Sequence, residues 1–265
     1  MWRASRLLLS AATLRAAAAD PPLDLTVLSW NVHWQCGSDH LPGCRAAAMA
    51  RVAELTDAHG ATVVVAIELE HNDTAPIDLP AHGLGGGHYP AWLQVNGSCP
   101  GAAGGAPGDA IALAFRPYVG LGPGWSPVVK SYAAGQPVYA AGGGCLGGDG
   151  GGPDPWDKAD SRAFAVALLK PPSPGVAGCE AGLCVIAMHS PHVDITKGAD
   201  TIAEVCGEAR HQCTVAVGDW NAPISKRSFC NFTVSDRWGQ LLGDEHPTTL
   251  IGAPDENTCC FPESK

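Results

Sequence analysis

The chain has 265 residues, of which 46% are hydrophobic and 16% are charged, and this balance indicates one globular domain with a substantial core. Its formal net charge of -10 argues against a sequence-independent basic grip on nucleic acid, although a local basic groove is compatible with it. The 33 glycines and 22 prolines predict long irregular loops between the regular elements.

Residues 1–19 resemble a short secretory signal. Met1–Arg6 is basic, Leu7–Leu14 is apolar, and Ala16–Ala19 offers a small-residue cleavage site. The lack of acidic residues also suits an organelle transit peptide. We expect a secreted or endoplasmic-reticulum-luminal protein, with another organelle as the alternative.

Hydrophobic patterning predicts an α/β domain over residues 20–265. In chain order we expect a strand at 25–30, a helix at 45–59, strands at 61–67, 109–115, 162–169 and 183–188, a helix at 197–211 and a strand at 213–217. The strand-helix-strand order at the start is typical of α/β proteins. We interpret the glycine-rich stretches 83–108 and 141–155 as surface loops. No apolar segment approaches the roughly 20 residues that span a bilayer, so we expect no stable membrane insertion.

Two further features favour an oxidising compartment. Eleven cysteines are many for a cytosolic enzyme and suggest disulfides, and their spacing matches no zinc module. Cys36/Cys44 and Cys179/Cys184 are close enough in sequence to staple loops, but the spacing alone leaves the connectivity open. Candidate glycosylation sequons begin at Asn72, Asn96 and Asn231.

Polar side chains follow four of the predicted strands. Asn31, Glu68 and His189 each come after an apolar run. Asp219 and Asn221 come after another, two residues apart and therefore on the same side of an extended chain. In a sheet sandwich such strand ends can converge at one edge. A carboxylate suits a hard cation, amides can hold a phosphate oxygen, and a histidine can donate a proton, so the pattern predicts a phosphate-and-metal site.

Each of these residues also has a structural interpretation. Glu68 could be a surface carboxylate at a strand end, and Glu70, two residues on, is a competing ligand. His189 could be a hydrogen-bonded structural histidine, and we interpret His192 as a loop residue. The aspartate-asparagine pair could cap a turn. Gly218, just before that pair, permits close approach of backbone or ligand.

The order of these motifs carries a family resemblance. Ser29-Trp30-Asn31, the strand that ends in Glu68, His189-Ser190-Pro191-His192 and Gly218-Asp219-Trp220-Asn221 together resemble the endonuclease/exonuclease/phosphatase superfamily, which includes the pancreatic-type deoxyribonucleases. The resemblance implies a four-layer α/β sandwich, in which two packed mixed sheets are flanked by helices. It also implies hydrolysis of a phosphate ester that depends on Mg²⁺ or Mn²⁺, by a phosphodiesterase or nuclease with DNA as one candidate substrate.

The resemblance also implies a role for each strand-end residue. Glu68 would bind the metal, and Asn31 would support it. His189 would stabilise the scissile phosphate or protonate the leaving group. Asp219 would position or activate the attacking water, and Asn221 would orient the phosphate. Together with the metal, these groups would stabilise charge that develops on the phosphoryl oxygens.

One part of the superfamily pattern is not found. Its members usually close with an aspartate and a serine-aspartate-histidine type motif, whose histidine acts in the general base, and residues 248–261 contain no such motif. We therefore expect the last strand to be missing, through a truncated gene prediction, a fragment or a degenerate family member. The resemblance to pancreatic-type deoxyribonucleases also suggests a disulfide between Cys230 and either Cys259 or Cys260.

Two other functions stay open. A catalytically impaired secreted glycoprotein could keep the fold and bind a phosphorylated ligand. A phospholipid or sphingolipid phosphodiesterase of the same fold is the alternative within the enzyme class, although no amphipathic or apolar membrane-binding segment favours it. A Ser-His-Asp hydrolase is disfavoured, because the sequence has no GxSxG elbow.

Overall fold

The computed structural model describes residues 25–32, 42–61, 63–70, 91–99, 109–115, 126–147, 162–170, 176–191, 194–222 and 233–243. None of the helices in these ranges is long and apolar enough to span a bilayer. Several predictions fall outside the described residues, namely the 1–19 signal, the sequons at Asn72 and Asn231, and the disulfide candidates Cys230, Cys259 and Cys260.

A four-stranded mixed sheet forms one half of the fold, in the order β1-β2-β4-β3. The two parallel strands β1 and β2 are connected through the helix α2, and the other pairs are antiparallel. Apolar, β-branched runs favour these strands, whereas an alanine-rich segment ending at a glycine favours the helix. The bounds are β1 (Val27–Asn31), α2 (Cys44–His59), β2 (Val63–Glu70), β3 (Ala91–Cys99) and β4 (Asp109–Phe115).

A five-stranded mixed sheet forms the other half, in the order β11-β10-β9-β5 with β8 also paired to β9. β10 and β11 are parallel, and the remaining pairs are antiparallel. The bounds are β5 (Ser126–Pro127), β8 (Ala141–Leu146), β9 (Arg162–Lys170), β10 (Leu183–His189) and β11 (Thr214–Asp219). The helices on this side are α3 (Ala199–Cys206), α4 (Ala209–Gln212) and α5 (Val234–Leu242).

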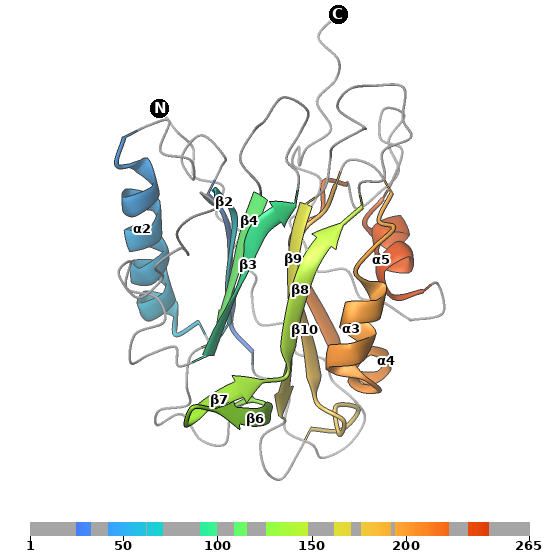
Figure 1. The fold of residues 1–265 in the computed structure, drawn as a ribbon. Helices are drawn as coiled ribbons and strands as arrows, with labels where there is room; N and C mark the ends of the chain where they lie inside the picture. The colour runs from blue at the N-terminus through green and yellow to red at the C-terminus, as the bar shows by residue number, and fades with distance from the viewer. Residues whose placement is uncertain are drawn as a thin grey trace, which may run out of the picture.

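The two sheets pack face to face, with α2 outside one sheet and α3, α4 and α5 outside the other (Figure 1). Successive side chains of β2 point to opposite faces of the first sheet. Val65 and Ile67 join the core between the sheets, whereas Val64 and Ala66 pack under α2. A third cluster, which includes Ile202, lies between the second sheet and its helices. The predicted mixed α/β class is therefore confirmed.

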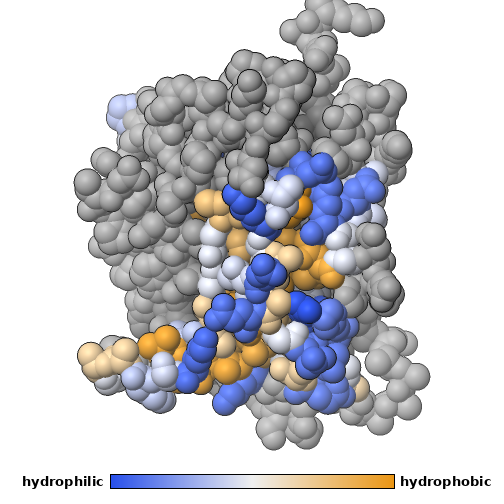
Figure 2. Space-filling model, turned by 45° about the vertical axis from the view of Figure 1, so that its right-hand side comes forward, coloured by the Kyte–Doolittle hydropathy of each residue, from blue (hydrophilic) through white to orange (hydrophobic). Residues whose placement is uncertain are grey.

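A small hairpin projects from the lower end of the sheets (Figure 1), formed by β6 (Val129–Ala133) and β7 (Gln136–Tyr139). All five residues of β6 are exposed. Apolar residues lie both in the middle and in the lower part of the face seen in Figure 2. In the hairpin, the large side chains that are exposed are Val129, Tyr132 and Val138. The hairpin follows β5, which pairs with the last residues of β9, so it lies at the end of the second sheet where β10 begins.

Two predicted loops contain strands. The prediction that 83–108 is a loop is wrong, because β3 lies there as an edge strand paired with β4; the sequon residue Asn96 is in this strand, although its side chain is not among those described. The glycine-rich stretch 141–155 contains β8, which pairs with β9 through backbone hydrogen bonds that need no side chain. A Cβ at Gly142 would lie 3.0 Å from Thr201 Cγ2, so the glycine lets α3 approach this strand closely.

Disulfides join neighbouring elements of the second sheet. Cys179 pairs with Cys213 and Cys184 pairs with Cys206, so the loop-stapling pair Cys179/Cys184 is wrong. Cys179 and Cys184 are near in sequence, but each bonds to a residue that follows β10 in the chain. Cys179 bonds to the residue directly before β11, and Cys184 bonds to the last residue of α3. The spacing alone could not show this, because Cys179 and Cys213 belong to the core between the sheets, whereas Cys184 and Cys206 belong to the cluster beneath the helices. Cys145 is also disulfide-bonded.

We expect the double variant Cys184→Ala/Cys206→Ala to lower the free energy of unfolding by about 3 kcal/mol, because the bond closes a loop of 22 residues in the unfolded chain. Urea unfolding under oxidising conditions would measure the loss. With reductant present, the wild type and the variant should unfold at nearly the same urea concentration. Equal midpoints under oxidising conditions would contradict the prediction.

Candidate functional site

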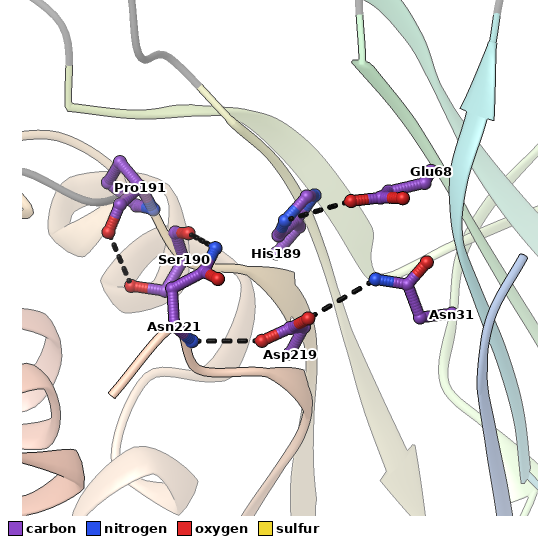
Figure 3. A network of polar contacts seen from close by, with 7 residues as sticks. All are labelled: Asn31, Glu68, His189, Ser190, Pro191, Asp219 and Asn221. Atoms are coloured by element: carbon purple, nitrogen blue, oxygen red, sulfur yellow. Dashed lines mark hydrogen bonds and ion pairs between the residues drawn. The ribbon is translucent and has the colours of Figure 1, made fainter. Parts of the chain in front are cut away.

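The ends of four strands meet at one edge of the two packed sheets (Figure 3). In the first sheet the parallel pairing sets Asn31 of β1 opposite Ile67 of β2, directly before Glu68. In the second sheet the parallel pairing sets His189 of β10 opposite Asp219 of β11. Parallel strands bring their carboxyl ends to the same edge, which is why polar residues that follow four separate strands come together.

Two contacts cross from one sheet to the other. Asn31 Nδ2 donates a hydrogen bond to Asp219 Oδ2 at 3.2 Å. His189 Nε2 lies 3.6 Å from Glu68 Oε1. Each sheet thus supplies one partner to each contact, and the relative placement of the sheets decides the geometry of the site.

The backbone at Glu68 departs from regular strand geometry. The register between β2 and β4 shifts between Ala66 and Leu69, and Glu68 has a φ of 58°, in the left-handed region. A β-bulge of this kind re-aims a side chain, and the left-handed backbone costs about 1 to 3 kcal/mol in a residue other than glycine. The strained residue is thus neither a glycine nor an asparagine, the residues that adopt this conformation most easily. It is Glu68, whose carboxylate points toward His189 (Figure 3).

The carboxylate of Asp219 is held on both oxygens. Its Oδ2 accepts the bond from Asn31, and its Oδ1 accepts a hydrogen bond from the Asn221 backbone N–H at 2.9 Å. The Asn221 backbone has a φ of 45°, which turns the chain back over the carboxylate. The Asn221 side chain is occupied too, because its Nδ2 donates to the Ser190 carbonyl at 2.5 Å. Asp219 and Asn221 therefore form one hydrogen-bonded turn.

Exposure differs across the site. The side chains of His189 and Glu68 are 2% and 13% exposed, whereas Asn31 is exposed and Asp219 is half-buried. The buried imidazole faces the Glu68 carboxylate at an ion-pair distance that is longer than a hydrogen bond. The site is thus a buried histidine-carboxylate pair behind a more accessible aspartate-amide group.

The predicted site residues Asn31, Glu68, His189, Asp219 and Asn221 are all brought together. Of the competing residues, Glu70 continues β2, and its side chain is not among those described, while His192 lies outside the described residues. Sequence reasoning missed the backbone carbonyl of Ser190 and the helix α5 beside it. The pattern Thr233 to Asp236, a capping box, could have indicated where that helix begins.

The donor chemistry fits a hard cation. Within the described part of the chain, no group of three or more His, Cys, Asp or Glu residues is placed to hold a metal ion. Mg²⁺ in phosphate chemistry is usually bound through one or two carboxylates, with water and substrate oxygens completing the shell. Glu68 offers a carboxylate of this type, and the amide oxygen of Asn31 is a further oxygen ligand beside it.

The chain is similar to solved structures of endonuclease/exonuclease/phosphatase proteins. One from Bacteroides vulgatus is 16% identical with a TM-score of 0.42, covering 76% of this chain and 67% of that one. The mannosyl-6-phosphatase of Bacteroides thetaiotaomicron is 16% identical with a TM-score of 0.41, covering 75% and 66%. ANGEL2, a 2',3'-cyclic phosphatase, is 16% identical with a TM-score of 0.42, covering 86% and 66%.

The chain spans about two thirds of the length of these structures. No protein-family model matches its sequence, and no curated protein matches it.

Proposed function

We propose that this chain is a metal-dependent phosphoester hydrolase of the endonuclease/exonuclease/phosphatase superfamily, with phosphodiesters such as DNA as its substrate class. The observation that carries the proposal is the convergence of polar residues from four strands and two sheets at one edge. Two contacts across the sheets, Asn31 to Asp219 and His189 to Glu68, support a preorganised site. We further infer that residues 20–265 belong to a domain with the four-layer α/β sandwich architecture.

Glu68, supported by Asn31, would hold Mg²⁺ or Mn²⁺. The bound cation would supply Lewis-acid stabilisation of charge on the phosphoryl oxygens. The backbone bulge at Glu68 supports this role, since strained residues persist where the surroundings hold them and cluster at functional sites.

The other residues would act on the phosphate and the water. His189 would donate a hydrogen bond to the scissile phosphate or a proton to the leaving group, and its burial beside Glu68 limits how the ring can turn. Asp219 would position the attacking water, with its carboxylate plane held by Asn31 and by the backbone of Asn221. The Asn221 amide would orient the phosphate. Each group is held before substrate arrives, which reduces reorganisation during the reaction.

The cellular location is part of the proposal. Disulfides such as Cys179–Cys213 and Cys184–Cys206 are compatible with an oxidising compartment. We propose secretion or retention in the endoplasmic reticulum lumen after removal of 1–19. Glycosylation at Asn72, Asn96 and Asn231, and a bond from Cys230 to Cys259 or Cys260, belong to the same proposal.

Metal removal tests the function directly. We expect the purified protein to hydrolyse bis-p-nitrophenyl phosphate or plasmid DNA with Mg²⁺ or Mn²⁺, to stop in EDTA, and to recover when the metal is restored. Glu68→Gln should raise the Mg²⁺ concentration for half-maximal activity by at least about tenfold, since even residues that only orient a metal ligand have effects of this size. A Mg²⁺ titration of the initial rate measures the shift.

Glu204→Gln is the matched control, because Glu204 is an exposed carboxylate of α3 that contacts Lys130 at 3.7 Å, away from the strand ends. Its Mg²⁺ dependence should equal that of the wild type. Turnover that is insensitive to EDTA would contradict the metal role. Binding of a phosphorylated ligand without turnover would instead favour the non-catalytic glycoprotein.

A further inference from the structure

A fully buried arginine lies behind the candidate site. Arg237, in α5, has 0% exposure, although arginine is almost never fully buried unless it is paired or hydrogen-bonded. Its Nη2 donates a hydrogen bond to the Pro191 carbonyl at 2.7 Å, and its Nη1 donates to Gln240 Oε1 at 3.3 Å. Removing a guanidinium from water is costly, so the full burial of this arginine against the Pro191 carbonyl calls for a specific explanation.

The same helix holds the loop after β10 at a second point. Gln240 Nε2 donates to Asp194 Oδ1 at 2.6 Å, and Gln240 Oε1 accepts from the Ile195 backbone N–H at 3.0 Å. Arg237 and Gln240 also contact each other, so the two anchors are one hydrogen-bonded unit on one helix. The loop is thus attached to α5 on either side of residues 192–193.

The loop is held from the opposite side by the candidate site itself. The Ser190 carbonyl accepts a bond from Asn221 Nδ2, and the Ser190 N–H donates to the Asp219 carbonyl at 2.8 Å. The carbonyls of Ser190 and Pro191 are consecutive, and one is bound by Asn221 while the next is bound by Arg237. The Ser190 N–H bond fixes the peptide plane between His189 and Ser190, and the two carbonyl bonds fix the next two peptide units.

We propose that Arg237 is a positioning residue for phosphoester hydrolysis, which sets the orientation of His189 and Asn221 through the Ser190-Pro191 backbone. The inference rests on the proposed function. Arg237 acts from inside the protein, because its side chain has 0% exposure and its Nη1 and Nη2 donate to Gln240 and Pro191. Arginine suits the task because its planar fork donates to two acceptors at once, which a lysine ammonium reproduces less well.

The test compares Arg237→Met and Arg237→Lys with Arg51→Met, a control at an exposed arginine on α2 that is paired with Glu54. We expect Arg237→Met to lower kcat by about tenfold or more, since small misplacements of catalytic groups are costly, with KM changed by less than about twofold. Arg237→Lys should recover part of the loss, and the control should match the wild type. Arg237→Lys serves as the informative variant if Arg237→Met does not fold.

A double-mutant comparison separates positioning from general destabilisation. In a His189→Ala background, Arg237→Met should lower kcat by a clearly smaller factor than it does in the wild type, because one of the two side chains that it positions is gone. If Arg237→Met lowers kcat by the same factor in the His189→Ala background as in the wild type, the inference is overturned. So would Arg237 variants that lower the melting temperature but leave kcat unchanged.

Histidine side-chain NMR gives a readout that needs no turnover. The His189 imidazole resonances should shift in Arg237→Met and stay unchanged in Arg51→Met. Unshifted resonances in an active protein would overturn the inference alone and leave the proposed function standing. A wild type without turnover would overturn the proposed function and, with it, a role of Arg237 in catalysis.

Discussion

Asp219→Ala should lower kcat/KM for phosphodiester hydrolysis by about 10²- to 10⁴-fold, the range expected when a group that positions or activates the nucleophile is removed. Asp219 lies at the end of β11, where its oxygens accept bonds from Asn31 and from the Asn221 backbone. The alanine variant loses the charge and also leaves those two donors without this acceptor. Steady-state kinetics at saturating Mg²⁺ measure the effect.

Asp219→Asn separates the charge from the hydrogen bonds. It keeps a carbonyl oxygen that can accept one of the two bonds, and we expect nearly the same loss of kcat with a smaller loss of stability. Asp200→Ala is the control, since Asp200 is an exposed aspartate in the first turn of α3. It should leave kcat/KM unchanged. Wild-type activity in Asp219→Ala would rule out the assigned role.

Gly218→Ala should lower the free energy of unfolding by more than about 4 kcal/mol or prevent folding, a loss of a size that needs an identifiable steric cause. A Cβ at Gly218 would lie 1.8 Å from the main-chain oxygen of Met188, its register partner on β10. The contact involves backbone on both sides, so no side chain can move to relieve it. The φ of 144° at Gly218 adds strain for any other residue.

Two other glycines separate the steric and conformational parts of this effect. Gly60→Ala changes a residue at φ 61° with nothing within 4 Å of the added Cβ, so it should cost only about 1 to 2 kcal/mol. Gly144→Ala places a Cβ 3.5 Å from Phe164 Cε1, an ordinary contact in β8, and should cost less than about 1 kcal/mol. Chemical denaturation of the three variants gives the comparison. Equal stabilities for Gly218→Ala and Gly144→Ala would contradict the close approach of β10 and β11.

The central strands were predictable because they are buried on both faces. Such strands appear as continuous apolar runs, as in Arg162–Lys170 and Leu183–His189, and the runs end where polar residues begin. β3 and β8 were not predictable in this way, because one is an edge strand and the other has three consecutive glycines. Their pairing depends on the partner strands β4 and β9 more than on their own composition.

One predicted helix lies where it was expected, but it is divided into two helices. The segment 197–211 forms α3 and α4, separated at Gly207, where the backbone leaves the helical region. A single glycine inside a helical pattern can be tolerated or can end the helix, and hydrophobic spacing does not distinguish the two. Here the disulfide at Cys206 and the packing against β10 lie directly before the break.

By itself, the amino-acid sequence determined which polar residues stand at the ends of apolar strands and in what order they occur. Asp219 and Asn221 are two residues apart, so their proximity could be predicted from sequence, although a left-handed turn at Asn221 and not strand periodicity makes the contact. Only the tertiary structure decided that Asn31 contacts Asp219, 188 residues away, and that Glu68 faces His189. Those contacts depend on how two sheets pack against each other, and no local pattern encodes that packing.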